Sequence, residues 1–144
     1  MLVSQILKSK PKQGVFTIPP DTSVADAAGI LSERRIGALI VVDAAGEPLG
    51  ILSERDIVRE LGRRGQVCLG DKVADLMTSD LVTCTGECST DEVLGRMTDG
   101  RFRHMPVMAG DKMIGVISIG DVVKARLDEL AQENSALQGM IMGH

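Results

Sequence analysis

Two nine-residue stretches of this chain carry side chains that could bind a ligand. Gly50–Val58 reads GILSERDIV, and Gly115–Val123 repeats the pattern as GVISIGDVV. In each copy a short apolar run, typical of a buried strand, leads to a serine and, three residues later, an aspartate. Both are favoured N-cap residues, so each copy predicts a strand that runs into the start of a helix. Helix starts attract anions and carboxylates accept hydrogen bonds from ribose hydroxyls, so the pattern indicates binding of a phosphate or a ribose.

The same residues also have a purely structural interpretation. Ser53 and Ser118 could serve only as N-caps, with Asp56 and Asp121 as first-turn acids favoured by the helix dipole. A single copy would not separate the two interpretations. Repetition of the pattern beside charged strand ends favours a ligand site.

Apolar periodicity around the two stretches predicts two copies of a β-α-β-β-α unit. In the first copy we expect strands at 15–18, 36–43 and 49–52 and helices at 23–35 and 56–64. In the second copy we expect strands at 81–84, 104–108 and 113–117, a helix from 89 and a last helix from 121. The Ser23–Asp26 and Ser89–Glu92 pairs predict capping boxes. A shift of 66 residues aligns the first part of the two copies, and a shift of 65 aligns the rest.

Shorter elements surround the two copies. An amphipathic helix is predicted over 1–8, and a linker at 66–71 leads to a short helical piece at 72–77. One unit buries only one face of a small sheet, so two copies should complete each other as a pseudo-twofold pair. We therefore expect an α+β fold in one compact module. Its predicted parts are repeat 1 with the N-terminal helix (1–66), repeat 2 (67–126) and a C-terminal helix extension (127–144).

The last helix is longer than one small unit can cover. Its apolar residues are Val122, Val123, Leu127, Leu130 and Leu137, followed by Met140, Ile141 and Met142. This excess predicts a homodimer surface on the end helices. The alternative is that these helices pack back on their own sheet.

Composition excludes several classes of function. Phe16 and Phe102 are the only aromatic residues among 144, so stacking on single-stranded nucleic acid is not expected. The net charge of 16 − 20 = −4 disfavours a polyanion partner but allows a small phosphate ligand. No apolar run approaches the roughly 20 residues that span a bilayer. The start of the chain also lacks a signal-peptide core, so we expect a cytoplasmic protein without a membrane partner.

The three cysteines give little support for a metal or a disulfide framework. Their number is odd, which is unlike a disulfide scaffold. Cys84, Cys88 and His104 offer two thiols and one distant imidazole, a weak match to a zinc site. Cys68 and the other two are most simply core or loop residues, and no metal is expected.

The repeated motifs resemble a tandem pair of cystathionine β-synthase (CBS) domains, also called a Bateman module. The resemblance covers the chain from about Val3 to Lys124. It is carried by four stretches, Arg35–Asp43 (RIGALIVVD), Gly50–Asp56 (GILSERD), Arg101–Val107 (RFRHMPV) and Gly115–Asp121 (GVISIGD). The chain resembles the stand-alone bacterial members of this family.

This resemblance implies two clefts between the repeats that bind AMP, ADP, ATP, NAD(H) or S-adenosylmethionine. The residues implied for the first are Ser53, Arg55, Asp56, Leu81, Val82, Arg103, His104 and Pro106. Those implied for the second are Gly14, Val15, Phe16, Ile36, Gly37, Ala38, Ser118 and Asp121. The aspartates would accept from ribose, the serines would contact phosphate or ribose, and apolar strand ends would flank adenine. Arg101, Arg103 and His104 add positive charge, so the first cleft should hold the more highly charged ligand.

The sequence thus predicts a non-enzymatic regulatory module that senses an adenine nucleotide, and with it the energy or redox state, as a homodimer. Neither a nucleophile paired with a base nor a phosphate loop is present, which makes an enzyme the weakest alternative. Two further alternatives stay open. One is a structural dimer that binds protein but no ligand, and the other is a thiol or metal sensor.

Overall fold

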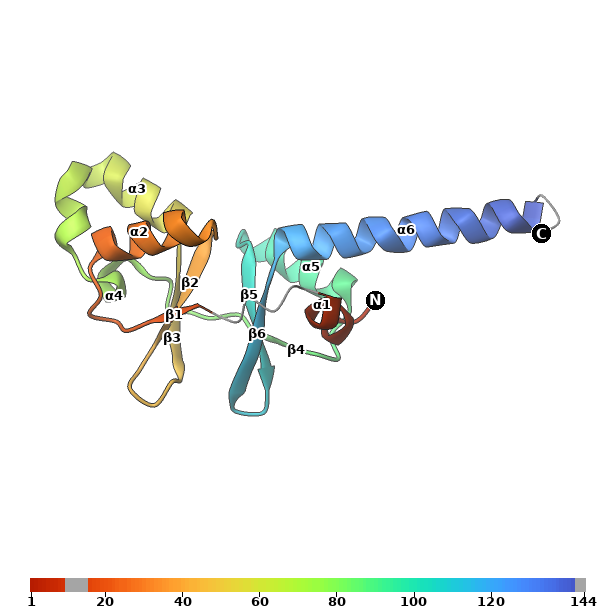
Figure 1. Cartoon of the computed structure of the whole chain (residues 1–144), viewed down its shortest axis with the longest axis horizontal. Helices are drawn as coiled ribbons and strands as arrows, with labels where there is room; N and C mark the ends of the chain where they lie inside the picture. The colour runs from red at the N-terminus through yellow and green to blue at the C-terminus, as the bar shows by residue number, and fades with distance from the viewer. Residues whose placement is uncertain (10–15, 142–144) are drawn as a thin grey trace. The chain divides into compact units, whose positions relative to one another are not determined.

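The computed structural model describes residues 1–9 and 16–141, so Gly14, Val15 and Met142 lie outside the described residues. Contacts divide the chain into two compact units, one formed by Met1–Gln13 with Thr83–His144 and the other by Gly14–Val82. Each unit contains one three-stranded sheet and its helices (Figure 1). The predicted α+β class is confirmed. No helix among residues 1–9 and 16–141 combines the length and the apolar character needed to cross a membrane.

The unit formed by Gly14–Val82 follows the predicted β-α-β-β-α order. Its elements are β1 (Thr17–Ile18), α2 (Val24–Arg34), β2 (Ala38–Val42), β3 (Pro48–Ser53), α3 (Glu54–Arg64), a 3-10 helix (Gly65–Gly70) and α4 (Val73–Leu76). β1 is parallel to β2, and β2 is antiparallel to β3. The inward face of α2 buries Val24, Ala27 and Leu31, which recur at helical spacing, against Leu39 and Leu52 of the sheet.

The other unit repeats this order with equivalent residues. Its elements are α1 (Val3–Ser9), β4 (Cys84–Thr85), α5 (Thr90–Gly100), β5 (His104–Ala109), β6 (Lys112–Ser118) and α6 (Ile119–Ile141). β4 is parallel to β5, and β5 is antiparallel to β6. Val93 and Met97 of α5 pack with Met105, Val107 and Ile117 of the sheet. An aliphatic and methionine core replaces the aromatic residues that the sequence lacks.

The strand predicted at 81–84 is wrong in its first three residues, because β4 begins at Cys84. In the first repeat, Ile40 N–H donates to Phe16 O at 3.1 Å and extends the parallel pairing by one residue. The 66-residue shift places Pro106 at the position of Ile40. Proline has no N–H to donate, so the equivalent pairing cannot form.

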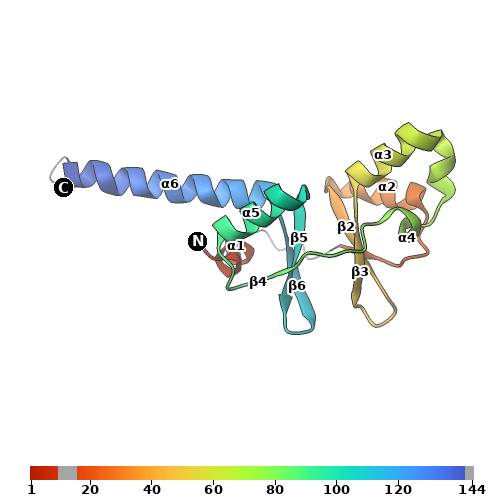
Figure 2. The same ribbon diagram turned by 180° about the vertical axis from the view of Figure 1, so that it is seen from behind.

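Two short helices, α1 and α4, each pack on the repeat that does not directly follow them in the sequence. α1 precedes the first repeat in sequence, yet it contacts β6 and α6 of the second, as Figures 1 and 2 show from opposite sides. α4 occupies the equivalent place in the first repeat, and Val3 and Val73 are both fully buried. By its contacts α1 therefore belongs with the second repeat, although the sequence order places it in the segment 1–66.

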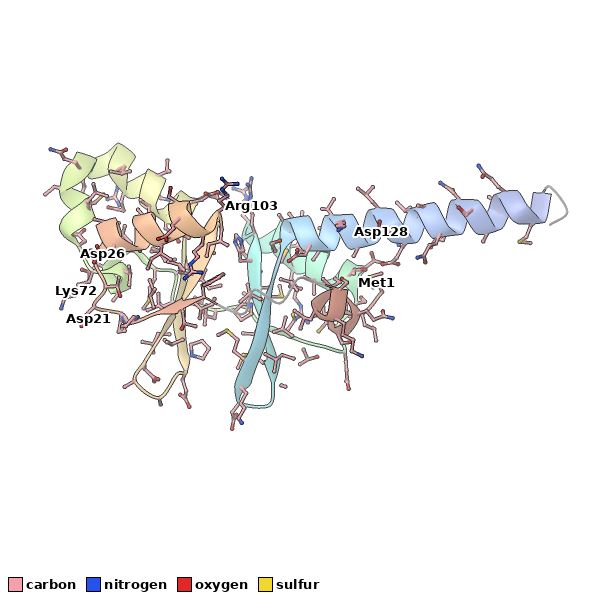
Figure 3. All side chains as sticks on the ribbon, in the orientation of Figure 1. Met1, Asp21, Asp26, Lys72, Arg103 and Asp128 are labelled. Atoms are coloured by element: carbon pink, nitrogen blue, oxygen red, sulfur yellow. The ribbon has the colours of Figure 1, made fainter. Side chains whose placement is uncertain are left out.

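Backbone hydrogen bonds fix these two helices in the same way. Val3 N–H donates to Cys88 O at 2.9 Å, and Val73 N–H donates to Thr22 O at 2.8 Å. An isolated β-bridge joins Lys72 to Ser23, beside Asp21 in Figure 3, and its equivalent joins Leu2 to Ser89. A shift of 70 residues relates α1 to α4, which differs from the 66-residue shift of the flanking elements.

Candidate functional site

The first candidate site is the start of α3, where Ser53 and Asp56 cap each other. Asp56 N–H donates to Ser53 Oγ at 3.2 Å, and Ser53 N–H donates to Asp56 Oδ2 at 2.9 Å. Ser53 Oγ also lies 3.0 Å from Asp56 Oδ2. The carboxylate is 5% exposed, and its Oδ1 lies 3.5 Å from the guanidinium of Arg59. This is a complete capping box, a geometry that satisfies the helix start without any ligand.

The start of α6 repeats this geometry with Ser118 and Asp121. Ser118 N–H donates to Asp121 Oδ2 at 2.9 Å, and Asp121 N–H donates to Ser118 Oγ at 3.1 Å. Both residues are half-buried. By contrast, Ser23 and Ser89 accept from Asp26 and Glu92 N–H, but no reciprocal bond to their own N–H is found among the described residues. The predicted boxes at those two helices are therefore single caps.

A backbone loop is held against each of these helix starts. Glu54 N–H donates to Gly37 O at 2.9 Å, and Ile119 N–H donates to Arg103 O at 2.8 Å. Strand register also places Ala38 opposite Ser53 and His104 opposite Ser118. Each unit therefore brings its own serine and aspartate together with the loop that enters β2 or β5. Figure 3 shows Arg103 at the end of β5 where α6 begins.

An arginine with a left-handed backbone begins each of these loops. Arg35 has φ 55° and Arg101 has φ 57°, the two positive values at non-glycine residues within the described parts of the chain. Both end a helix at its C-cap, a place where glycine is usual because a Cβ is disfavoured in this conformation. Two equivalent arginines in this strained conformation mark both loops as candidate functional positions. The 66-residue shift aligns Arg35 with Arg101.

The two sites differ in charge. Arg103 is exposed and His104 is half-buried, whereas Gly37 and Ala38 stand at the equivalent positions of the other unit. Arg101 corresponds to Arg35, and both arginines are exposed. Arg55, which follows the cap residue of α3, is also exposed and corresponds to Gly120. The loop before β5 therefore carries Arg103 and His104 where the loop before β2 has uncharged residues, and the start of α3 carries Arg55 where α6 has a glycine. Both sites have arginines that can supply the positive charge that a phosphate or carboxylate ligand requires.

Several predicted site residues have evident structural roles. The guanidinium of Arg34 lies over the Phe16 ring, 5.1 Å from its centroid, and Phe16 and Ile36 both pack against the core of their unit. Pro106 is buried within β5. Leu81 is half-buried and Val82 is exposed, and both lie outside the strands. The structure brings Gly37 and Ala38 to Ser53 and Asp56, and it brings Arg103 and His104 to Ser118 and Asp121. Gly14 and Val15 lie outside the described residues.

The cysteine cluster has contacts of a structural kind. Cys84 Sγ lies 3.8 Å from Pro106 O, and Cys88 Sγ lies 3.5 Å from Thr85 N. Burial, with a smaller effect of the neighbouring Cys88, raises the pKa of the Cys84 thiol to about 11. The thiol is then almost fully protonated at neutral pH, and a protonated thiol is a poor nucleophile and metal ligand. No group of three or more His, Cys, Asp or Glu side chains suited to a metal occurs in the described parts of the chain.

Both repeated units are similar to a known family of protein domains. The model of the CBS domain family matches this chain twice, over residues 3–63 and 73–128. The chain belongs to the CBS domain family. The CBS domain-containing protein CBSX3, mitochondrial, of Arabidopsis thaliana is 36% identical over 148 residues, covering 98% of this chain and 72% of that protein. The crystal structure of a CBS-domain containing protein from Agrobacterium tumefaciens has 44% identity and a TM-score of 0.83, covering 87% of this chain and 92% of that one.

Two similar CBS structures contain an adenine compound. The CBS domain pair of protein MJ0100, 25% identical with a TM-score of 0.77, was solved in complex with 5'-methylthioadenosine and S-adenosyl-L-methionine. It covers 90% of this chain and 98% of that one. A CBS domain protein from Pyrobaculum aerophilum, complexed with AMP, shares the fold at 23% identity and a TM-score of 0.76, covering 92% of this chain and 99% of that one.

Proposed function

We propose that this CBS domain pair is a non-enzymatic regulatory module that binds an adenine-containing ligand. The observation that carries the proposal is the reciprocal Ser–Asp cap beside an arginine-led loop, which occurs at Ser53–Asp56 and again at Ser118–Asp121. The adenine compounds bound to the MJ0100 CBS pair support the ligand class. AMP, ADP, ATP, NAD(H) and S-adenosylmethionine are the candidates.

Each part of the ligand has a matching group in the chain. The carboxylate oxygens of Asp56 and Asp121 can each accept more than one hydrogen bond, so these side chains can also accept from a ribose hydroxyl. Arg101 and Arg103 can bind a phosphate or carboxylate through several N–H donors. The resemblance assigns Arg103 and His104 to the site of Asp56, whereas these residues neighbour Asp121 in their own unit. Whichever aspartate completes the site, these arginines favour the more anionic ligand there.

The module would act as a homodimer whose ligand shifts the populations of two conformations. A ligand can shift such an equilibrium only by the difference between its affinities for the two conformations. No chemical step is needed for this mechanism. Incubation with ATP and magnesium should therefore yield no product beyond that of an Asp56→Ala control, and turnover above that control would overturn the proposal.

A thermal-shift screen of AMP, ADP, ATP, NAD, NADH and S-adenosylmethionine tests the ligand class. Any ligand that binds only the folded protein raises its melting temperature by mass action. We expect at least one compound to stabilise the wild type, and the Arg101→Gln/Arg103→Gln variant to lose most of that shift. These arginines are exposed, so their replacement should leave the fold intact.

A matched pair of cap variants separates ligand loss from simple destabilisation. Ser118→Ala removes the cap at the candidate site, and Ser89→Ala removes a similar cap on α5, whose helix start bears none of the predicted site residues. Each should cost about 1 kcal/mol of stability. Only Ser118→Ala should also reduce the ligand-induced shift. No binding of any compound at millimolar concentration would instead favour a structural, ligand-free dimer.

A further inference from the structure

α6 carries two apolar stripes, and its own unit covers only one of them. Val122 and Ala125 are buried in the core, and Glu129 Oε1 lies 3.1 Å from Thr90 Oγ1. The second stripe consists of exposed residues, Val123, Leu127, Leu130 and Leu137. At about 100° per residue, it lies roughly 130° around the helix from the first stripe. The second stripe therefore points away from the core of the unit.

The helix also continues beyond the part that its unit supports. Among the described residues of α6, side-chain bonds to the rest of the unit end at Glu129. Residues 131–138 are all exposed, and Figures 1 and 3 show α6 running past α1 and α5, with side chains projecting around it near and beyond Asp128. An isolated helix shorter than about 12–15 residues is marginal in water. The exposed residues 131–138 therefore gain little stability from packing on their own unit.

The exposed stripe has the spacing of a coiled coil. Val123, Leu127, Leu130 and Leu137, with Asn134 between the last two, follow the alternating steps of four and three that define d, a, d, a and d positions. Leucine occupies the next two d positions after Val123. The one polar residue, Asn134, takes an a position. A single buried asparagine at an a position is known to set register and to favour two strands.

We propose that α6 pairs in parallel with α6 of a second copy of this chain to form a short two-stranded coiled coil. This inference deepens the homodimer of the proposed function by naming its interface and its direction. The occupant is a second copy because the stripe is self-complementary. In a parallel pair each leucine meets its own counterpart, and the two Asn134 amides can donate to and accept from each other.

An antiparallel pair fits the same sequence poorly. The register that matches all a and d residues would place Asn134 against Leu130 of the other helix and leave a buried amide without a polar partner. The same antiparallel register would also bring Glu133 of one helix next to Glu133 of the other, because this residue lies beside the centre of the paired segment. Like charges placed opposite each other disfavour pairing. The parallel pair places Glu133 opposite Gln138 instead.

This arrangement links the candidate ligand site to the dimer. α6 begins at the Ser118–Asp121 cap and ends in the proposed coiled coil, so one helix connects the two. This link, unlike the coiled coil itself, rests on the proposed ligand binding. A ligand that repositions the start of α6 would reach the second copy through this helix.

Sedimentation of the full chain tests the interface. Leu137→Glu places a charge at a d position beyond the supported part of α6, and Ser135→Glu adds the same charge on another face as a matched control. We expect the dimer dissociation constant to rise at least tenfold for Leu137→Glu and to stay within twofold for Ser135→Glu. A monomeric wild type, or a dimer that tolerates Leu137→Glu, would overturn the coiled coil. The latter result would leave the homodimer and the ligand proposal standing.

Cysteine cross-linking tests the direction of the pair. In a Cys88→Ser background, Leu137→Cys should form a disulfide-linked dimer at least ten times faster than Gln132→Cys, which lies on the outer face. The Leu130→Cys/Asn134→Cys variant tests the antiparallel alternative. Position 130 of one helix would face position 134 of the other only in the antiparallel pair, whereas in a parallel pair each position faces its own counterpart. Equal rates for Leu137→Cys and Gln132→Cys would contradict the parallel arrangement. So would heterologous links between positions 130 and 134, identified by peptide mapping.

Discussion

Gly115 of β6 and Leu7 of α1 lie so close that a Cβ added to the glycine would stand 2.8 Å from Leu7 Cδ2. The equivalent glycine of the first repeat, Gly50, is as crowded, with Thr78 O at 2.8 Å and Met77 Sδ at 2.7 Å. Each glycine lets a short segment cross the sheet at close range. The exchange of α1 and α4 between the repeats therefore depends on a missing side chain in β3 and in β6.

Alanine at these two glycines should cost different amounts. Gly50→Ala meets a backbone carbonyl that cannot rotate away, so we expect a loss of about 1–3 kcal/mol in unfolding free energy. Gly115→Ala meets the end of a leucine side chain, which can change rotamer, and should cost less. Urea denaturation measures both. A larger loss for Gly115→Ala would show that α1 is held more rigidly than its contacts indicate.

Glycine at the left-handed arginines should separate stability from binding. Relief of the left-handed strain is worth about 1–2 kcal/mol, while the added freedom of the unfolded chain offsets about 0.4–1 kcal/mol of it. Arg35→Gly and Arg101→Gly should thus each gain between about 0 and 1.6 kcal/mol. We expect Arg101→Gly to weaken ligand binding despite this gain. A variant that gains stability and keeps full affinity would remove Arg101 from the site.

The thiol of Cys84 should react slowly in the folded protein. With its pKa at about 11, only on the order of one thiol in a thousand is ionised at pH 8. Iodoacetamide labelling followed by peptide mass analysis should modify the half-buried Cys88 well before Cys84. The labelling rate of Cys84 should rise about tenfold per pH unit until the pH approaches 11. In urea both cysteines should react at similar rates, and early labelling of Cys84 in the native protein would restore the thiol-sensor alternative.

Acid should weaken the junction between α3 and the 3-10 helix. Hydrogen bonding from Arg64, the largest cause, holds the pKa of Glu60 below its ordinary value of 4.5. Arg64 also pairs with Asp71, which ends the 3-10 helix. A carboxylate with a lowered folded pKa stabilises the fold above its unfolded pKa, and this contribution disappears as the pH falls through the folded value.

The Glu60→Gln variant tests this sign. Its unfolding free energy should depend less steeply on pH than that of the wild type between about pH 5 and 3. The two proteins should differ most near neutral pH and converge in acid. Denaturation curves at several pH values measure the difference, and parallel pH profiles would exclude Glu60 as a contributor.

The repeated elements could be predicted from the sequence because their signals are local. Apolar periodicity and the serine caps placed α2, α5 and the β2–β3 and β5–β6 hairpins within one or two residues. The partner of α1 could not be predicted in this way, because a helix next to the first repeat in sequence packs on the second. The similarity of the segments around Val3 and Val73, at a shift of 70 residues, is the sequence signal that relates α1 to α4. The start of β4 at Cys84 follows from Pro106, which lacks the N–H that Ile40 donates to Phe16 O in the first repeat. Hydrophobic periodicity alone does not contain this information.

The candidate site was predicted in part. The Ser53–Asp56 and Ser118–Asp121 pairs were identified from residue types and spacing alone. The sequence could not show that Ser53 and Ser118 form reciprocal capping bonds while Ser23 and Ser89 form single caps. All four serines are followed by an acidic residue three positions later. The left-handed backbone of Arg35 and Arg101 has no signal in residue type, because glycine is the residue usually expected there.

Isothermal titration calorimetry with AMP, ATP and S-adenosylmethionine tests the central claim most directly. The wild type should bind at least one of them, and Arg101→Gln/Arg103→Gln should bind it at least tenfold more weakly, a change of about 1.4 kcal/mol. Ser89→Ala should bind as the wild type does. If no compound binds at millimolar concentration, or if the double arginine variant keeps its affinity, the two Ser–Asp caps are structural and the account of the site is wrong.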